Sequence, residues 1–149
     1  MFFHTIRVFR GRELQLDNEL LELLKYRYAR AIETLEVAKE LFKNGKFKDV
    51  NNRSYYAAYY AMRAVYTLRG KDFKKHKTLL SEFNKEFVAS EIFPRTLGRK
   101  ISMLALIREQ SDYNDFYIAS SAESQQQVEI AEELIKLVKE YLKKQGIEI

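Results

Sequence analysis

The sequence of 149 residues contains no cysteine, no tryptophan, one proline and five glycines. Without cysteine, the chain can form neither disulfides nor metal sites with thiolate ligands. The two histidines, His4 and His76, lie far apart in the sequence and lack the spacing of a zinc site. We therefore predict no metal site and no cofactor. With so few helix breakers, long helices are the natural expectation.

Long apolar runs are also missing. No stretch approaches the roughly 20 apolar residues that a transmembrane helix needs. The first 13 residues carry arginines within their apolar part and end without a cleavage signature, so they do not resemble a signal peptide. The expectation is a cytoplasmic protein that makes no contact with a membrane.

Hydrophobic residues make up 46% of the chain, which is long enough to bury a core as one domain. The net charge of +5 permits binding to RNA or a nucleotide but does not demonstrate it. Phe2, Ile6 and Val8 indicate a short strand, an arm on a second subunit or a poorly ordered start. We therefore divide the chain into an N-terminal arm or tail, residues 1–13, and a helical domain, residues 14–149.

Apolar residues recur at spacings of three and four through most of the chain, which is the period of amphipathic helices. The first helix is expected over 20–42, with Asp17 or Asn18 as its N-cap and Asn44-Gly45 as its stop signal. Further helices are expected over 48–68, 77–88, 94–110 and from a cap at Ser120 or Ser121 to Gly146, with a non-helical stretch over 111–121. Short connections make neighbouring helices antiparallel. The predicted fold is all-α, an up-and-down bundle of four to five helices in a single domain.

Residues 51–70 form the most distinctive stretch, because tyrosine and alanine cover almost every side of the predicted helix. A helix that is apolar nearly all round belongs in the middle of a bundle, and its excess apolar surface also favours a subunit interface. The tyrosines are expected to pack there with hydrogen-bonded hydroxyls, the alternative being stacking platforms for bases. The predicted dimer seam consists of Tyr55, Tyr56, Tyr59 and Tyr60.

The segment 108–115 is the leading candidate for a functional site. It gathers a guanidinium, carboxylates and a phenol where a helix is expected to end and its carbonyls need partners. Arg108 lies near the apolar stripe of its helix, so it must be paired or face a cleft. In the functional interpretation Arg108 contacts a phosphate, with Asp112 and Tyr113 beside it. In the structural alternative, an Arg–Asp ion pair stabilises the end of the helix.

Two further residues are candidates. Arg53, near the start of the tyrosine-rich helix, is placed to pair with Asp112 or Asp115 across the bundle or to contact a phosphate. His76 lies in a basic loop, whose charges should lower the pKa of the imidazole below its ordinary value near 6.5. A neutral imidazole can act as a base. The alternative is an exposed histidine in a solvated turn.

Several segments are familiar in combination: N-R-S-Y-Y-A-A-Y-Y-A-M-R-A at 52–64, K-x-H at 74–76, F-N-K-E-F at 83–87 and R-E-Q-S-D-Y-N-D-F at 108–116. In this order they resemble the HEPN domain (higher eukaryotes and prokaryotes nucleotide-binding), in particular its small stand-alone prokaryotic members. The resemblance runs from about residue 20 to residue 142. It implies a helical bundle that forms homodimers. Many such proteins are encoded beside a minimal nucleotidyltransferase and act with it as a toxin–antitoxin pair.

The resemblance also implies roles for the candidate residues. Active HEPN members are metal-independent ribonucleases with an R-x4-6-H motif, whose arginine binds phosphate and whose histidine helps to move the proton of the attacking 2′-hydroxyl. Arg108 matches the arginine, but Tyr113 follows where the histidine is expected. A phenol with an ordinary pKa near 10 is a poor base at neutral pH, and the adjacent Asp112 repels phosphate. His76 is the candidate substitute from elsewhere in the chain.

The resulting prediction is a homodimeric HEPN-type module of a toxin–antitoxin pair, which binds a nucleotidyltransferase partner and a nucleotide or RNA. One alternative is a metal-independent ribonuclease toxin that uses Arg108, and the other is a purely structural interaction protein. Whether the protein is an enzyme stays open at this point. The catalytic candidates are Arg108, Tyr113 and His76, and the phosphate-binding candidates are Arg53, Arg108 and Asp112.

Overall fold

The computed structural model describes the backbone of residues 12–149 and the side chains from residue 18 onward. The described chain is helical and contains no strand. Its elements are α1 (Arg12–Lys43), α2 (Phe47–Thr67), α3 (His76–Phe83), the π-helical turn η2 (Asn84–Val88), α4 (Thr96–Tyr113) and α5 (Ser121–Lys144). None of these helices is long and apolar enough to cross a membrane. The predicted arm, residues 1–13, lies almost entirely outside the described residues.

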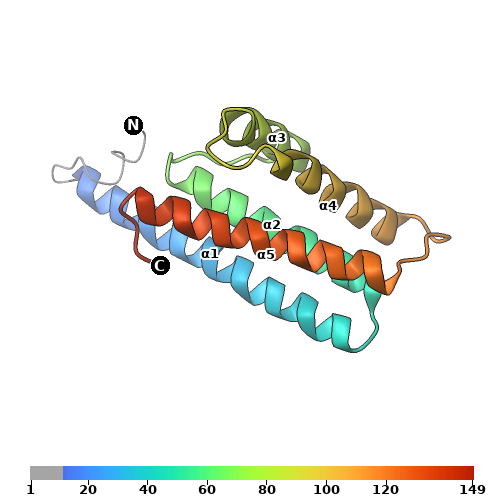
Figure 1. Cartoon of the computed structure of the whole chain (residues 1–149). Coiled ribbons are helices and arrows are strands. Elements are labelled where there is room, and N and C mark those ends of the chain that lie inside the picture. Colours follow the sequence, from blue (N-terminus) through green and yellow to red (C-terminus); the bar gives the residue numbers. More distant parts are fainter. Residues whose placement is uncertain (1–11) are drawn as a thin grey trace.

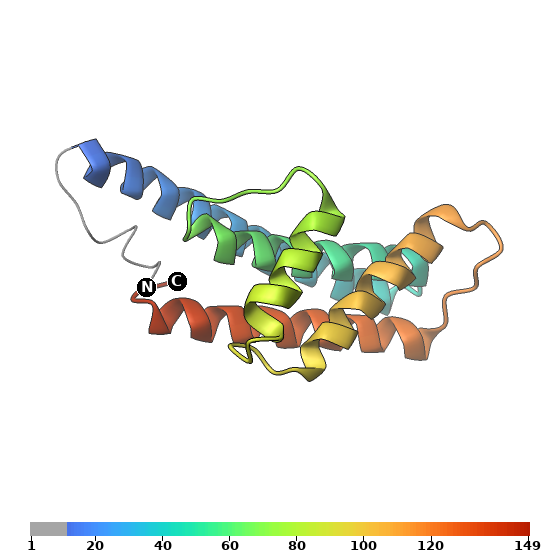
Figure 2. The same cartoon turned by 90° about the horizontal axis from the view of Figure 1, so that it is seen from above.

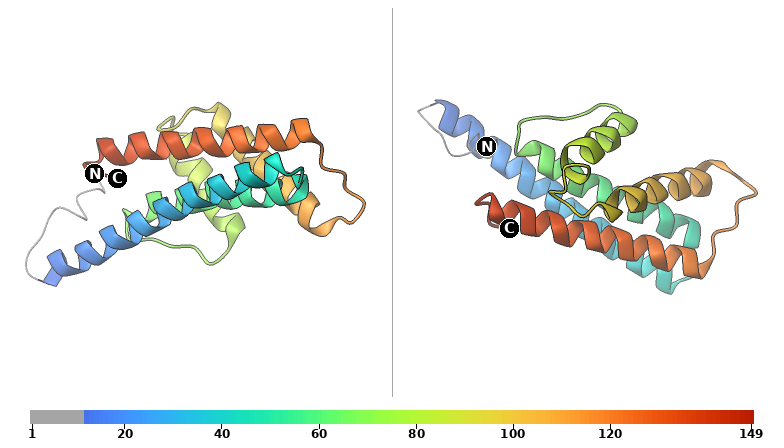
Figure 3. Two further views of the ribbon diagram at one scale, coloured as in Figure 1. Left: turned by 90° about the horizontal axis from the view of Figure 1, so that it is seen from below. Right: turned by 45° about the horizontal axis from the view of Figure 1, so that its top comes forward.

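The long helices alternate in direction, as an up-and-down bundle requires. α1, α2 and α5 lie side by side, with α2 antiparallel to α1, and α4 runs antiparallel to α5 (Figure 1). The short α3 crosses the direction of the long helices steeply (Figure 2). α3 and α4 together cover one side of the layer that the three longest helices form (Figure 3, right). The predicted all-α bundle in a single domain is confirmed.

The tyrosine- and alanine-rich helix α2 occupies the middle of this arrangement and contacts all four other α-helices. Small residues such as Ala57, Ala61 and Ala64 are completely buried and let the neighbouring helices approach closely. Larger side chains fill the remaining sides, among them Tyr55, which is 1% exposed. The prediction that this helix lies inside the bundle is therefore confirmed.

The predicted helix ends are correct at some positions and wrong at others. Gly45 adopts a φ of 72° just after α1, and the Ser120 hydroxyl caps α5 by accepting a hydrogen bond from the Glu123 amide. The predicted cap at Asp17 or Asn18 is wrong, because both residues lie within α1. The stretch after Gly11 contains Arg, Glu, Leu and Gln, which are strong helix formers, so the helix begins earlier than its clear apolar periodicity.

The predicted end of the fourth helix is also wrong, since α4 continues beyond residue 110 to Tyr113. A buried polar link holds this last turn. The Asn51 amide donates to the Ser111 hydroxyl at 3.0 Å and accepts from the Ser124 hydroxyl at 3.0 Å. α2, α4 and α5 are thus joined at one point, and the longer α4 carries Asp112 and Tyr113 on the same helix as Arg108.

Candidate functional site

Arg108 projects from α4 onto the tyrosines of α2. Its Cζ atom lies 4.7 Å from the centre of the Tyr55 ring and 5.6 Å from that of Tyr56, which is the geometry of a cation–π contact. The side chain is only 14% exposed. Burial alone would lower the pKa of Arg108, but Tyr56, Tyr55 and Asp112 outweigh it, so the guanidinium stays charged. This is a partly buried permanent cation held on an aromatic surface.

The ion pair between Arg108 and Asp112 is a long one. Asp112 Oδ2 lies 3.5 Å from Arg108 Nη1, and the same oxygen accepts a shorter hydrogen bond of 2.9 Å from the Asn52 amide. The Arg108 Nε atom is buried and has no hydrogen-bond partner among the described residues. A buried donor without a partner is costly to a protein. The part of the guanidinium that remains accessible can donate to an additional acceptor such as a phosphate oxygen.

The structure brings His76 into the same cluster, although it precedes Arg108 by a whole helix. His76 begins α3, and its Nδ1 atom lies 2.9 Å from the Tyr55 hydroxyl oxygen. The imidazole also stacks on the Tyr59 ring with 4.3 Å between ring centres. Its other nitrogen, Nε2, makes no hydrogen bond within the described part of the chain. Tyr55 therefore contacts His76 through its hydroxyl and Arg108 through its ring.

The electrostatics of this cluster favour a neutral imidazole. Burial lowers the pKa of His76 below its ordinary value of 6.5, and the charges of Arg108 and Arg63 lower it further. Burial also raises the pKa of Tyr55 to about 12, against the opposing effect of Arg108, so the phenol keeps its proton. When His76 carries its hydrogen on Nδ1 and donates it to Tyr55, the lone pair on Nε2 is free to accept a proton.

The structure places Tyr113 and Arg53 at the edges of this cluster. The Tyr113 ring centre lies 5.8 Å from Arg108 Cζ, and the side chain is 74% exposed. Arg53 pairs neither with Asp112 nor with Asp115, contrary to the sequence interpretation. Its Nε donates instead to the adjacent Asn52 side chain at 2.8 Å. Its guanidinium lies over Tyr56, 5.2 Å from the ring centre.

The four tyrosines of the predicted dimer seam have different surroundings in the single chain. Tyr55 and Tyr59 are buried against His76, whereas Tyr56 and Tyr60 are only partly buried. The residues that could reach a second subunit are therefore the latter two. The seam itself stays a prediction.

Sequence reasoning missed two residues that shape the site. Asn52 donates to the Asp112 oxygen that lies nearest Arg108, and Arg63 lies over Tyr59 with its Cζ 5.6 Å from the ring centre. The signal for Asn52 was present, because the sequence places two asparagines at the start of an otherwise apolar helix. No three histidine, aspartate or glutamate side chains of the described residues come close enough together to hold a metal ion.

Comparison with known families decides the class of this bundle. Residues 24–141 match the HEPN domain, a region that contains every residue of the cluster around Arg108. The chain belongs to the HEPN family. Within the matched region, Tyr113 follows Arg108 where the resemblance implies a histidine, and the His76 imidazole at the start of α3 contacts Tyr55, the residue whose ring lies under Arg108.

The chain is also similar to individual proteins of other organisms. A UPF0332 protein of Thermotoga maritima is 35% identical over 66% of this chain and 74% of its own length. A protein of Methanocaldococcus jannaschii that bears the name "Putative toxin MJ0605" is 29% identical over 66% of this chain and 73% of its own length. A UPF0332 protein of Pyrococcus horikoshii is 33% identical over 47% of this chain and 49% of its own length.

Proposed function

We propose that this protein is a cytoplasmic, toxin-type HEPN module that binds RNA at Arg108 and cleaves it without a metal ion. The observation that carries the proposal is the double contact of Tyr55, which has the Arg108 guanidinium on its ring and the His76 imidazole on its hydroxyl. A phosphate-binding cation and a neutral base are thereby held in one cluster. The name of the Methanocaldococcus jannaschii relative agrees with a toxin role.

In the proposed reaction, Arg108 binds the phosphate and stabilises the negative charge that grows on its oxygens. His76 takes the proton of the neighbouring 2′-hydroxyl at Nε2, and the 2′ oxygen forms a new bond to phosphorus. The bond from phosphorus to the 5′ oxygen breaks, and that oxygen takes a proton from water. The resulting hydroxide is neutralised by the proton on His76. The products are a 2′,3′-cyclic phosphate and a 5′-hydroxyl end.

The remaining candidates take supporting roles in this proposal. Tyr113 presents an exposed hydroxyl that can donate a hydrogen bond to the bound phosphate or stack on a base. Arg53 offers a second cation near Tyr56 for the next phosphate along the strand. Asp112 limits how strongly Arg108 attracts an anion, because its carboxylate lies beside the guanidinium.

The test is cleavage of a single-stranded RNA by the purified protein in EDTA. Arg108→Ala should reduce the rate about 10²- to 10³-fold, and His76→Gln should reduce it by a similar or larger factor. Arg99→Ala removes an exposed arginine from the same helix and serves as the control for loss of positive charge. His4→Gln is the control for loss of a histidine. Neither control should change the rate more than about twofold.

The possible results separate the alternatives. Cleavage that requires Arg108 but not His76 would remove the histidine from the mechanism and leave Tyr113 as the candidate base. If the wild-type protein binds RNA without cutting it, the protein is a binding module. If Arg108→Ala changes neither binding nor cleavage and only costs roughly 1–3 kcal/mol of stability, the Arg108–Asp112 pair is structural.

A second role is favoured by the apolar surface next to the site. Leu106, Tyr113, Phe116 and Ile118 are large apolar side chains at least half exposed, with Phe116 reaching 92%. Exposed apolar clusters commonly mark protein interfaces. We propose that this surface contacts either a second copy of the chain or the nucleotidyltransferase partner that the family resemblance implies.

A double variant tests this second role. Phe116→Ser with Ile118→Ser should leave the fold intact, because both side chains face solvent. Light scattering of the protein alone reports whether the variant weakens a homodimer. Titration with a nucleotidyltransferase encoded by an adjacent gene reports whether it weakens a hetero-complex. Unchanged mass and unchanged affinity would exclude this surface from both interfaces.

A further inference from the structure

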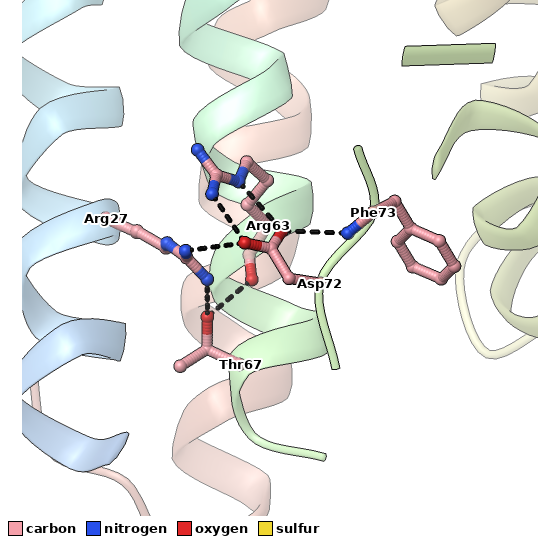
Figure 4. A network of polar contacts seen from close by, with 5 residues as sticks. All are labelled: Arg27, Arg63, Thr67, Asp72 and Phe73. Atoms are coloured by element: carbon pink, nitrogen blue, oxygen red, sulfur yellow. Dashed lines mark hydrogen bonds and ion pairs between the residues drawn. The ribbon is translucent and has the colours of Figure 1, made fainter. Parts of the chain in front are cut away.

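A group of charged side chains connects α1, α2 and the loop that leads into α3 (Figure 4). We call Arg27, Arg63 and Asp72 the loop clamp. The Asp72 carboxylate accepts hydrogen bonds from Arg63 Nη2 at 2.8 Å and from Arg27 Nη2 at 2.9 Å. It also accepts from Arg63 Nε at 3.2 Å and from the Phe73 amide at 2.9 Å. Asp72 therefore fixes the loop to two helices at once.

The arginines of the loop clamp are themselves held in place. Arg27 Nη1 donates to the Thr67 hydroxyl at 2.8 Å, and that hydroxyl donates to the Arg63 carbonyl at 2.8 Å. The side chains of Arg27 and Arg63 are only 11% and 23% exposed, respectively. Two guanidiniums with restricted positions thus converge on one carboxylate. Such an arrangement defines where the loop must lie more narrowly than a single flexible ion pair could.

The charge of Asp72 responds to this environment. Burial would raise the pKa of the carboxyl, but hydrogen bonds from Arg63 and the Phe73 amide and the charges of Arg27 and Arg63 lower it below its ordinary value. The carboxylate is nevertheless 48% exposed, and ion pairs with that much solvent contact contribute little to global stability. The main effect of the Asp72 ion pairs is therefore local, on the position of the residues directly after the loop.

The loop ends at His76, the first residue of α3. The N-cap position, Lys75, makes no side-chain capping hydrogen bond, so no local cap fixes the start of this short helix. The nearest fixed points before it are Asp72 in the loop clamp and Phe73, whose ring packs on Tyr66 with 4.9 Å between ring centres. The His76 ring itself stacks on Tyr59. Arg63, which belongs to the loop clamp, lies over the same Tyr59 ring.

We propose that Asp72 is a positioning residue for His76: held between Arg27 and Arg63, it sets the loop so that the imidazole stacks on Tyr59 and reaches the Tyr55 hydroxyl beside Arg108. The catalytic meaning of this placement rests on the proposed function. The placement itself does not, because it concerns only contacts within the chain. Asp72 touches neither Arg108 nor His76 directly and is not a catalytic residue.

The test substitutes Asp72→Asn, which keeps the size of the side chain and removes its charge. The readout is the NMR spectrum of the His76 ring, whose protons are shifted by the stacked Tyr59 ring and should show nuclear Overhauser contacts with Tyr59 and Tyr55. In Asp72→Asn these contacts should weaken and the shifts should move toward those of a free histidine. The matched control is Glu132→Gln, which breaks an ion pair of α1 with α5 (Lys39–Glu132, 2.6 Å) at a similarly exposed carboxylate.

Cleavage provides the second readout. Asp72→Asn should lower the turnover of RNA about tenfold to a hundredfold with little change in affinity, because Arg108 is untouched while the imidazole is misplaced. Glu132→Gln should change neither. If the wild-type protein does not cleave RNA, the proposed function fails, and the NMR comparison still decides the role of Asp72. His76 signals that are identical in Asp72→Asn and wild type would overturn the positioning role.

A milder variant covers the case in which Asp72→Asn does not fold. Arg27→Gln removes one arm of the loop clamp and leaves the contacts of Arg63 with Asp72 intact. It should give a smaller change in the His76 ring signals in the same direction. An unchanged His76 environment in a folded Arg27→Gln protein would show that Arg27 does not contribute and would contradict the two-armed arrangement.

Discussion

Two arginines, Arg69 and Arg108, lie on aromatic rings in different parts of the bundle, and they differ in how closely each is paired with its carboxylate. Arg69 Nη1 lies 2.6 Å from Glu86 Oε2, and the other oxygen of Glu86 accepts a 2.7 Å hydrogen bond from the Tyr66 hydroxyl. Arg108 lies 3.5 Å from its carboxylate, Asp112, whose nearer oxygen is bound to Asn52.

The difference between the two clusters separates a structural ion pair from a candidate site. Both guanidiniums rest on an aromatic ring, with Arg69 Cζ 4.7 Å from the centre of Phe87 and Arg108 Cζ at the same distance from that of Tyr55. The aromatic support is therefore not what distinguishes them. What distinguishes Arg108 is the longer distance to its carboxylate, whose nearer oxygen also accepts from the Asn52 amide, and a neighbouring imidazole that contacts the same tyrosine.

Among the substitutions that compare the Arg69 and Arg108 clusters, Glu86→Gln is expected to have the largest effect on stability. The substitution removes the negative charge that faces Arg69 in a site where both side chains are mostly buried. We expect a loss of about 2–3 kcal/mol in the free energy of unfolding, measured with urea, and no change in RNA cleavage. Removal of the charge of Asp112 should cost less than about 1 kcal/mol. Equal losses at the two positions would mean that the Arg108 cluster is also a structural pair.

A second contrast uses the buried tyrosine hydroxyl in each cluster. Tyr66→Phe removes a hydrogen bond to a charged carboxylate, which should cost about 1.5 kcal/mol of stability. Tyr55→Phe removes a bond to the neutral His76, which should cost about 1 kcal/mol or less, and it should slow cleavage because the imidazole loses its anchor. Urea denaturation and the RNA assay of both variants give the comparison. Slower cleavage in Tyr66→Phe but not in Tyr55→Phe would reverse our assignment of the two clusters.

The sequence predicted the elements of the fold better than it predicted the contacts between them. The apolar periodicity located the helices, and the alanines of α2 indicated its central position. These features are local, so a single sequence reveals them. The end of α4 was misplaced because a tertiary link from Asn51 to Ser111 prolongs the helix through a stretch of turn-forming residues.

The site was predictable in part. Arg108, Asp112 and Tyr113 follow one another along one helix, so the sequence alone grouped them. The nearness of His76 to Arg108 depends on how steeply α3 crosses the bundle, and no local pattern records that angle. For the same reason the pairing of Arg53 with Asp112 was wrong: Asp112 accepts from Asn52, the neighbour of Arg53, and forms an ion pair with Arg108 on its own helix.

The carboxylate beside Arg108 offers a test of anion binding. Asp112→Asn should tighten the binding of a single-stranded oligonucleotide with 2′-deoxy sugars roughly threefold to tenfold, because a negative charge next to the phosphate site is removed. Fluorescence anisotropy measures the affinity, and the gain should shrink at about 0.5 M salt, where the Debye length is only a few ångströms. Asp115→Asn is the matched control, since Asp115 is exposed and forms no ion pair with Arg108. Equal gains in both variants would indicate a general charge effect.

The smallest expected difference between the Arg108 and Arg69 clusters is in how the stability contributed by each depends on pH. Burial and the charges of Arg108 and Arg63 lower the pKa of His76 below 6.5. As the pH falls through 6.5, the unfolded chain binds a proton at this position that the folded chain does not, so stability decreases with acidity. For Glu86, burial would raise the pKa, but bonds from Tyr66 and Arg69 lower it below 4.5.

The Glu86 contribution to stability is therefore complete above pH 4.5 and is lost only as the pH falls through its lowered pKa. Between about pH 6.5 and pH 4.5, the difference in unfolding free energy between wild type and His76→Gln reports the effect of His76 in the Arg108 cluster. His4 and Glu86 are present in both proteins, so their contributions cancel. We expect wild type to lose stability relative to His76→Gln as the pH falls from about 7 to about 5.5. A constant difference across this interval would mean that His76 titrates freely in solvent, and the proposal that it lies neutral beside Arg108 would fail.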